Sequence, residues 1–410
     1  MPGEKNNTLF LFTAAYPYGH KNEPFLENEI EYLAREFKEV VIFPHTKPSN
    51  EKRVVPENVT INNCMAEADQ NPKKKHLLLN IFFTLKILLY SARSLRRIRS
   101  FWLNHKLLLD IISIGIIQGT ALKKELKNKD LDNTIFYDYW FFNANFSIQY
   151  LRKNRKIKKY ICRAHRFDIY DESWPTVNVP FLEWRLKNID EVYFISKHGL
   201  NYIKDKLDRA DYNKKLKQSY LGVRRPVFDK NRRKCDELFT IVSCARVVDF
   251  KRVHLIPKVL CKIKSKIKWI HFGDGPLFSE LEKNCKNLPE HVEFELKGHT
   301  SNTEVHNFYK SCKPDLFMSI SVSEGLPVSM MEAIGYGVPI LAVDAGGINE
   351  IVSDQTGELL RHDIKLERIA KTLDEFIDNK SFQEENVKAF FDNNFSAGKN
   401  YGKFILALKS

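Results

Sequence analysis

The stretch SEGLPVSMMEAIGYGVPILAVDAGGINEIV, residues 323–352, carries two glutamates, Glu324 and Glu332, around a turn from a strand to a helix. An apolar run at 316–320 predicts a short buried strand before it, and Pro327 stands where the first turn of a helix tolerates a residue without an N–H. A second apolar run at 339–343 and a Gly-Gly turn follow. This order of strand, helix and strand predicts an α/β fold with a parallel sheet.

The two glutamates are predicted to line a ligand site, because ligands of open α/β sheets bind at the carboxyl ends of the strands. The spacing alone is not specific, since Glu23 and Glu31 repeat it. Gly325 lets the backbone approach a ligand, and the N-terminus of the following helix favours an anion. Carboxylates accept hydrogen bonds from sugar hydroxyls, so we expect a sugar and a phosphate here. Two solvated glutamates on a helix face are the alternative.

Residues 323–352 resemble the signature of the retaining family-4 glycosyltransferases, the EX7E enzymes of the GT-B fold. The resemblance implies that Glu324 holds hydroxyls of the donor sugar and that Glu332 holds the ribose of the nucleotide. It also implies a nucleotide-sugar donor, UDP- or GDP-linked, with no cofactor and no metal ion. Gly325, Leu326 and Pro327 are expected to contact this donor.

The sequence CARVVDFKRVHLI, residues 244–256, resembles the G-R-x-x-x-x-K-x-x-x-L/I pattern of the same family, with Cys244 or Ala245 in place of the first glycine. It follows a predicted strand at 239–244 and places Arg246 and Lys251 at its carboxyl end. Two cations there would neutralise a diphosphate and stabilise the charge that develops on the leaving oxygen. A solvated pair of cations is the alternative.

Two further turns of this half carry expected donor contacts. Gly273 and Gly275 belong to the turn HFGDGP, residues 271–276, which the resemblance places near the nucleotide phosphates. They are expected to provide space rather than chemistry. Lys297 belongs to LKGH, residues 296–299, where the family holds the base through backbone contacts.

In the first half, ICRAHRFDIYDE, residues 161–172, resembles the R-x-H-x-x-D segment of the family. The resemblance places His165 near the donor sugar and phosphate, so His165 joins Glu324, Arg246 and Lys251 in the predicted catalytic set. A structural histidine is the alternative. The opening YPYGHKNEPFLENEIEYL, residues 16–33, resembles bacterial surface-polysaccharide members, with Gly19 as a flexible point facing the diphosphate and acceptor. The pair Tyr139-Trp140 occurs in the same branch but equally suits a core.

A chain of 410 residues with 43% apolar residues is long enough for two domains. Strands are predicted at 8–14, 40–44, 134–140, 158–164 and 192–196, and again at 239–244, 269–273, 292–296, 316–320 and 339–343. The resemblance implies two Rossmann-like domains facing a central cleft. We expect an acceptor-binding domain at 1–223, a nucleotide-sugar-binding domain at 224–385, and a helical tail at 386–410 that packs back toward the first domain.

The seven cysteines show no C-x-x-C pair and no zinc spacing, which favours a reduced compartment. The N-terminal residues show no signal-peptide pattern, and the apolar run at 76–92 is short for a span of about 20 residues. The chain is therefore expected in the cytoplasm, alone or attached peripherally to the inner face of the plasma membrane.

The net charge of +14 is unevenly distributed along the chain. Residues 1–223 hold 37 Lys and Arg against 25 Asp and Glu, whereas residues 224–410 hold 28 against 26. Residues 70–109 contain nine Lys and Arg, no acidic residue, and many leucines and phenylalanines. This composition predicts either an amphipathic segment on an anionic membrane surface or a basic helix pair packed on its own domain. No nucleic-acid-binding motif accompanies the charge.

The resemblance implies a retaining glycosyltransferase that moves a sugar from a nucleotide to a glycan or lipid-linked acceptor, in cell-surface polysaccharide biosynthesis. A nucleotide-sugar epimerase or a phosphorylase on the same fold is the alternative among enzymes, because fold does not fix chemistry. A non-catalytic sugar-binding partner subunit is the alternative outside enzymes. The only closely spaced aspartates, Asp130 and Asp132, lie in a lysine-rich turn and are expected to be solvated.

Overall fold

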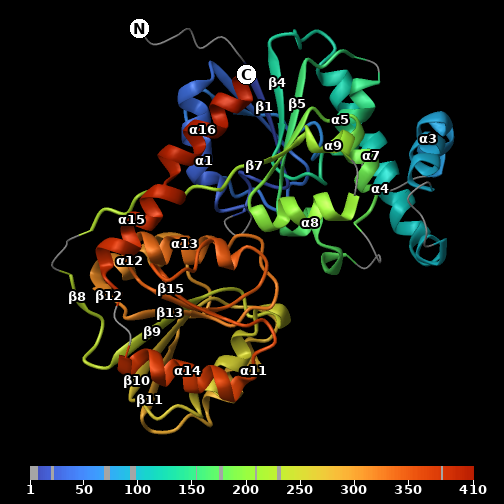
Figure 1. Cartoon of the computed structure of the whole chain (residues 1–410). Coiled ribbons are helices and arrows are strands. Elements are labelled where there is room, and N and C mark those ends of the chain that lie inside the picture. Colours follow the sequence, from blue (N-terminus) through green and yellow to red (C-terminus); the bar gives the residue numbers. More distant parts are fainter. Residues whose placement is uncertain are drawn as a thin grey trace. The chain divides into compact units, whose positions relative to one another are not determined.

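The computed structural model describes residues 8–19, 23–68, 74–92, 98–153, 155–174, 179–207, 210–228, 232–379 and 382–410. The chain divides into two compact units, one of residues 1–219 and 401–410 and the other of residues 220–400 (Figure 1). Each unit is built on a parallel sheet with helices on its faces.

The first unit contains a seven-stranded sheet in the order β3-β2-β1-β4-β5-β6-β7. Its strands are β1 (Thr8–Thr13), β2 (Glu39–Pro44), β3 (Val59–Ile61), β4 (Thr134–Asp138), β5 (Lys159–Ala164), β6 (Glu191–Phe194) and β7 (Leu216–Gln218). Its helices are α1 (Leu26–Glu36), α2 (Lys74–Leu79), α3 (Ile81–Ala92), α4 (Ile98–Glu125), α5 (Asn145–Arg152), α6 (Arg166–Ile169), η1 (Asp171–Ser173), α7 (Leu182–Lys187), α8 (Lys197–Leu207) and α9 (Ala210–Asn213).

The second unit contains a six-stranded sheet in the order β11-β10-β9-β13-β14-β15 and a two-stranded sheet of β8 and β12. The strands are β8 (Arg233–Lys234), β9 (Phe239–Cys244), β10 (Ile267–Phe272), β11 (Val292–Leu296), β12 (Cys312–Lys313), β13 (Leu316–Ser319), β14 (Ile340–Val343) and β15 (Gly357–Leu360). The helices are η2 (Asp249–Lys251), η3 (Val253–Leu255), α10 (Ile256–Leu260), α11 (Phe278–Cys285), α12 (Asn302–Ser311), α13 (Val328–Gly335), η4 (Ile348–Glu350), α14 (Leu366–Asn379) and α15 (Glu384–Asn394). The last helix, α16 (Ala397–Lys409), begins in this unit, and its residues from Tyr401 onward belong to the first unit.

Both faces of the first sheet are buried, as the continuous apolar character of its central strands requires. On β1, Leu9 and Leu11 belong to one core cluster, whereas Phe10 and Phe12 belong to another. Successive side chains of a strand point to opposite faces, so helices must cover both sides. The end of α16 helps to cover one of these faces, because Phe404 packs in the same core cluster as Leu9. Figure 1 shows α16 beside α1.

Each of the ten predicted strands occurs, with its ends shifted by at most two residues. The sequence did not predict the edge strands β3, β7 and β15 or the short pair β8 and β12. Their two to four residues carry too little alternation to stand out from a loop. Pro327 also differs from the prediction, because it is the N-cap of α13 and the helix begins one residue later, at Val328.

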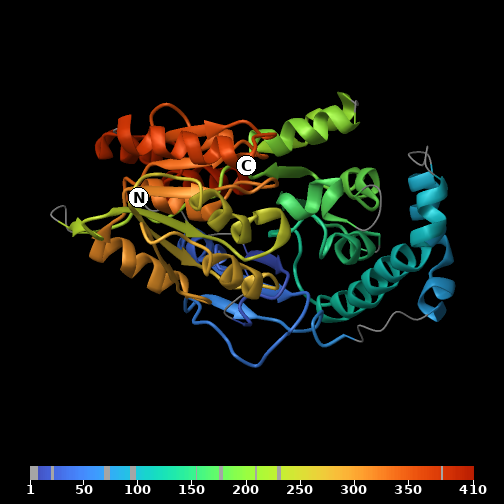
Figure 2. The same ribbon diagram turned by 90° about the horizontal axis from the view of Figure 1, so that it is seen from below.

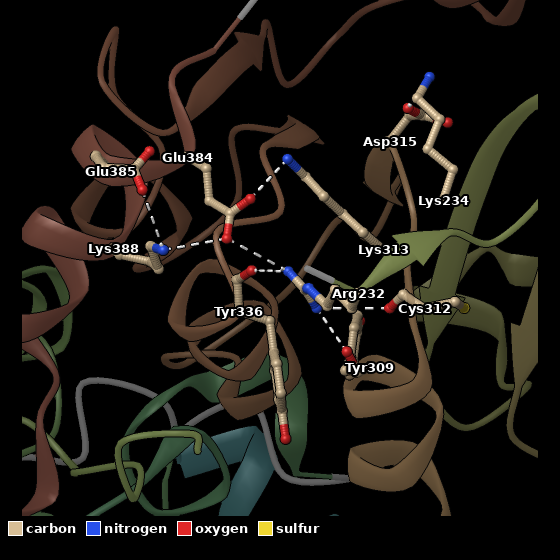
Figure 3. A network of polar contacts seen from close by, with 10 residues as sticks. All are labelled: Arg232, Lys234, Tyr309, Cys312, Lys313, Asp315, Tyr336, Glu384, Glu385 and Lys388. Carbon is tan, nitrogen blue, oxygen red and sulfur yellow. Dashed lines mark hydrogen bonds and ion pairs between the residues drawn. The ribbon is translucent and has the colours of Figure 1, made fainter. Parts of the chain in front are cut away.

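The cysteines correct the expectation of fully reduced thiols, because Cys235 and Cys312 form a disulfide. It lies at the β8–β12 pair, where a polar network also gathers (Figure 3). Arg232 donates to the carbonyl oxygens of Tyr309 and Tyr336, and Glu384 Oε2 lies 2.7 Å from Lys313 Nζ. The start of the second unit is thereby tied to the ends of α12 and α13 and to the start of α15.

Candidate functional site

The strand order reverses between β9 and β13 in the second unit, because the chain runs outward from β9 to β11 and then returns to the other side of β9. Ligands of open α/β sheets bind at such a switch point, beyond the carboxyl ends of the strands. The loop after β9 carries Arg246 and Lys251, and the loop after β13 carries Glu324. Val322 N donates to Phe250 O at 2.9 Å, which joins the two loops.

Lys251 and Glu324 form an ion pair at this switch point. Lys251 Nζ lies 2.5 Å from Oε1 and 2.7 Å from Oε2 of Glu324. The Glu324 side chain is 7% exposed and the Lys251 side chain 22% exposed, so the pair is largely removed from water. The structure therefore brings together the two charges that were predicted from separate motifs, and it makes Lys251 the counter-ion of Glu324.

Glu332 lies on α13 and is held by side chains of α12. Asn302 Nδ2 donates to Glu332 Oε1 at 2.8 Å, and His306 Nε2 lies 3.5 Å from the same oxygen. The other ring nitrogen of His306 is 3.0 Å from the hydroxyl of Tyr336. Glu332 is buried but keeps its second oxygen outside these contacts, so the carboxylate is oriented and can still accept from a ligand.

Cys244 lies near both carboxylate positions. Burial, followed by the negative charge of Glu332, raises the pKa of its thiol to about 12, although the charge of Lys251 opposes these effects. The thiol therefore stays protonated at neutral pH and contributes no charge. Either Cys244 or Ala245 stands at the position of the first glycine of the resembled pattern, and both residues line the pocket at this site.

A pocket opens between the loop after β9, the loop after β13 and the start of α13. The N-terminus of α13 bounds it, and helix N-termini favour anions through unpaired N–H groups and the helix dipole. Gly325 and Leu326 are buried in the loop that leads to this helix. Residues lining the pocket include Cys244, Ala245, Lys251, Glu324, Pro327 and Ser329.

Glycines allow these loops to pack closely. A Cβ on Gly273 would lie 2.0 Å from Ala245 O, and one on Gly275 would lie 2.5 Å from Val247 O. A Cβ on Gly346 would lie 1.8 Å from Glu324 O, and its φ of +59° also disfavours a side chain. Gly273 and Gly275 therefore provide space for the loop of Arg246 and Lys251, and Gly346 does the same for the loop of Glu324.

Arg246 and Lys297 differ in their surroundings. Arg246 is exposed, and its guanidinium has no ion pair among the described residues, so its charge is available to an anion. Lys297 Nζ lies 2.5 Å from Glu295 Oε2, and its backbone N–H already donates to His271 O at 2.9 Å. The N–H of Lys297 is therefore not available to hold a base.

In the first unit, His165 lies beyond the end of β5 in an aromatic surrounding. Its ring centroid is 4.5 Å from that of Trp140 and 4.8 Å from that of Tyr139. Burial, followed by the charge of Arg163, lowers its pKa to about 3, so the imidazole is neutral. Nε2 lies 3.1 Å from Tyr139 O and must carry the proton, because a carbonyl only accepts. Nδ1 is then an acceptor, and in the capping box at the start of α6 the His165 side chain accepts from the backbone N–H of Asp168.

Glu23 is a site residue that sequence reasoning missed. Its carboxylate accepts from the backbone N–H groups of Ala14, Ala15 and Tyr16, at 2.9, 2.8 and 2.7 Å, and from the indole of Trp140. These N–H groups lie at the carboxyl end of β1, where the strand order of the first sheet reverses. A carboxylate of the chain thus fills the place where an anion would bind.

Gly19 lies in the next turn with a φ of +71°. Its N–H donates to Glu51 O at 3.0 Å, and its carbonyl accepts from Arg53 at 2.7 Å. The turn is therefore held by its neighbours rather than left flexible at this residue. Residues 20–22, which follow it in the predicted motif, lie outside the described residues.

No group of three or more His, Cys, Asp or Glu side chains within the described ranges has the arrangement of a metal site. Within the same ranges, no helix combines the length and apolar character needed to span a bilayer.

Residues 225–390 match the family described as Glycosyl transferases group 1. This range contains Arg246, Lys251, Glu324 and Glu332 and most of the second unit. Residues 225–390 are therefore a glycosyl transferases group 1 domain.

The sequence similarity to curated relatives extends beyond this domain. An uncharacterized glycosyltransferase of Methanocaldococcus jannaschii is 29% identical over 215 residues, 51% of this chain and 57% of the relative. Protein CapJ of Staphylococcus aureus is 31% identical over 291 residues, 67% of this chain and 63% of the relative. The O-antigen biosynthesis glycosyltransferase WbnH of Escherichia coli is 30% identical over 155 residues, 37% and 41% of the two chains. The chain thus spans less than two thirds of the length of each of these relatives.

Solved structures similar to this chain cover nearly all of it. The lipopolysaccharide outer core galactosyltransferase WaaB matches with a TM-score of 0.67 and 14% identity, over 98% of this chain and 99% of that one. HepE of Anabaena, solved with UDP-glucose, matches with a TM-score of 0.63 and 14% identity over 98% and 99%. The fold is GT-B, with two Rossmann-like domains, as the sequence predicted.

Proposed function

We propose that the protein is a retaining glycosyltransferase of family 4 that takes a sugar from a nucleotide donor bound by the second unit. The observation that carries this proposal is the switch point of a glycosyl transferases group 1 domain, where the Lys251–Glu324 ion pair lies and Glu332 follows on α13. An oriented carboxylate can bind the hydroxyl groups of a sugar, and positive charge can stabilise a leaving diphosphate. This site offers both kinds of group.

In the proposed mechanism, Glu332 accepts a hydrogen bond from the ribose and Glu324 from the donor sugar. Arg246, Lys251 and the N-terminus of α13 stabilise the negative charge on the departing diphosphate. With retention, the acceptor hydroxyl attacks from the face of the leaving group and gives its proton to the departing phosphate. The side chains of this site therefore bind and stabilise charge, and none is assigned as a nucleophile.

We propose UDP- or GDP-sugars as donors and a glycan or lipid-linked acceptor, in cell-surface polysaccharide biosynthesis. The complex of HepE with UDP-glucose supports the donor class, and the O-antigen role of WbnH supports the pathway class. We place the protein in the cytoplasm, with residues 70–109 at an anionic membrane surface.

The charge of residues 70–109 offers one test of that placement. Neutralising Lys73, Lys74, Lys75, Arg93, Arg96, Arg97 and Arg99 should weaken binding to anionic vesicles at low salt, because each basic residue near such a surface contributes about 1 kcal/mol. All seven of these side chains lie outside the described part of the structure. Donor binding should be unchanged. If wild type and the neutralised variant float equally with the vesicles, the basic residues do not contribute to membrane binding.

The function itself is tested by donor binding and transfer. UDP- and GDP-sugars should raise the melting temperature of the native protein, because they bind the folded state. Glu332→Ala should weaken the bound donor by about 1 to 3 kcal/mol, the contribution of a hydrogen bond to a charged group. Glu293→Ala, an exposed glutamate of the same unit, is the matched control. Calorimetry that gave equal affinities for the two variants would contradict the assignment of Glu332.

Transfer is then measured with the effective donor, with and without EDTA. We expect transfer to persist with EDTA, because cationic side chains neutralise the diphosphate in the proposed mechanism. Activity that disappears with EDTA and returns with Mg²⁺ or Mn²⁺ would contradict this. Incubation with donor alone distinguishes the alternatives, since an epimerase converts the donor sugar without an acceptor and a binding subunit leaves it unchanged.

A further inference from the structure

The outer face of α2 and α3 in the first unit is apolar. Figures 1 and 2 place α3 beyond α4, at the edge of this unit and away from its sheet. The exposed fraction of six large apolar side chains here lies between 44% and 82%, and they account for more than half of all the exposed large apolar residues of the described chain. They are Leu78, Leu79, Ile81, Phe82, Leu85 and Leu89.

The inner face of the same helices is fixed, so the outer face is a defined surface. Phe83 and Ile87 belong to a core cluster with residues of α4, α5 and α7. The ring centroid of Phe83 lies 5.4 Å from that of Tyr150 and 6.0 Å from that of Trp184. Asn80, between α2 and α3, accepts from the Tyr150 hydroxyl at 2.9 Å. Helix α3 is therefore apolar on both faces, although only one of them packs on the protein.

Water-exposed apolar patches of this kind mark interaction surfaces, and the surrounding charge indicates the partner. Lys86 is exposed on the outer face, and residues 70–109 contain nine Lys and Arg and no acidic residue. Leucine and phenylalanine on one face with basic residues around it are typical of helices that lie in the interface of an anionic bilayer. Helix α3 has 12 residues, which is too short to span a bilayer and long enough to lie along its surface.

We propose that α2 and α3 dock the protein on an anionic membrane by inserting Leu78, Leu79, Phe82, Leu85 and Leu89 into the acyl-chain boundary. The apolar side chains then supply a contribution that salt does not screen, in addition to the salt-dependent attraction of the basic residues. The purpose of docking, access to a lipid-linked acceptor, rests on the proposed function. The docking itself does not require that function.

The test is flotation of the full chain with vesicles of phosphatidylcholine and phosphatidylglycerol, at low salt and at 1 M NaCl. We expect wild type to float in both conditions, less completely at high salt. The variant Phe82→Ser, Leu85→Ser, Leu89→Ser should lose on the order of tenfold in partition coefficient for each substitution. The matched control is Val54→Ser, Val227→Ser, Leu406→Ser, in which side chains with exposed fractions between 70% and 97% lie outside α2 and α3.

Each outcome decides the proposal. Loss of flotation in the α3 variant alone supports it, and equal flotation of the two variants, or none for wild type, overturns it. If wild type is a dimer without lipid, does not float, and becomes monomeric in the α3 variant, the surface joins two copies of the chain and the proposal is wrong. Thermal-shift binding of the nucleotide sugar by the same proteins reports on the proposed function separately, because donor binding does not use α3.

Discussion

At the scale of single residues, the site depends on a buried ion pair rather than on two independent charges. Lys251 Nζ lies within 2.7 Å of both oxygens of Glu324, and the pair is largely shielded from water. Removing one partner of such a pair leaves the other charge buried without compensation, which costs more than removing both. Lys251 therefore stabilises the site by neutralising Glu324, independently of any donor.

We predict that Lys251→Met lowers the free energy of unfolding by about 3 kcal/mol, because Glu324 loses its counter-ion in a buried place. The double variant Lys251→Met, Glu324→Gln should recover most of this loss. Urea unfolding of wild type, both single variants and the double variant measures the coupling. Additive effects of the two single substitutions would show that the pair does not interact.

His165 is predicted to remain neutral over the physiological pH range. Its pKa of about 3 in the folded chain lies below the ordinary histidine value of 6.5, so the unfolded chain binds more protons between these two pH values. The stability that the neutral ring contributes is fully present above pH 6.5 and is lost as the pH falls toward 3. NMR titration of labelled histidines, with His165→Gln to assign the signal, checks this. A His165 signal that titrates near 6.5 would mean that the ring is not buried as described.

At the scale of elements, turns fix where the charged side chains lie. The loop that carries Glu324 packs against the turn after β14, where Gly346 meets Glu324 O and Gly347 N donates to Gly325 O at 3.0 Å. The Gly-Gly turn at 346–347 is therefore part of the site, although neither glycine carries a functional group.

We predict that Gly346→Ala displaces the Glu324 loop and weakens donor binding by at least about tenfold, since a misplaced hydrogen bond to a carboxylate costs about 1.5 kcal/mol or more. Gly402→Ala, in α16, is the control, because no atom lies within 4 Å of the Cβ added at Gly402. Gly346→Ala should also lose about 1 kcal/mol of stability for the left-handed backbone. Only Gly346→Ala should lose donor affinity, as measured by calorimetry, and equal affinities would remove the turn from the site.

The sequence was sufficient to predict the elements with strong periodicity. The ten longer strands and the parallel sheets follow from apolar runs such as 239–244, and the switch-point location of Glu324 follows from the order of strand, loop and helix. The edge strands β3 and β7 could not be predicted, because three residues such as Val59–Ile61 gain their structure from pairing with a neighbour.

The missed contacts at the site depend on tertiary structure. A capping box of Ser301 and Glu304 marks the start of α12 and could have been recognised, but nothing in it indicates that Asn302 reaches Glu332. Glu23 precedes Pro24 in an ordinary helix-start pattern. Its φ of +48° and its contacts with three N–H groups of another loop appear only in the folded chain.

At the scale of the whole molecule, the two sheets share one strand order and use their switch points differently. In the first unit the carboxylate of Glu23 accepts hydrogen bonds from the N–H groups after β1. The switch point of the first sheet therefore already holds a negative charge. In the second unit the corresponding point offers Lys251, Arg246 and the N-terminus of α13. This difference in charge supports the proposal that the donor phosphates bind to the second unit.

A disulfide bond also connects two segments of the second unit. The Cys235–Cys312 disulfide joins residues 77 apart and connects β8 to β12, directly after the end of α12. Five cysteines are free, at positions 64, 162, 244, 261 and 285. Since α12 carries Asn302 and His306, the link also restrains the helix that orients Glu332.

We predict that the protein purified without reductant and unfolded in guanidinium presents five reactive thiols, and that reductant raises the number to seven. Replacing both Cys235 and Cys312 with serine should lower the free energy of unfolding of the second unit by about 4 kcal/mol, the loop-closure entropy for this separation. Cys261→Ser, at an exposed free cysteine, is the matched control and should change it little. Thiol titration with a chromogenic disulfide and urea unfolding measure the two effects. Seven reactive thiols without reductant would restore the expectation of a fully reduced chain, and the double variant should then be as stable as the control.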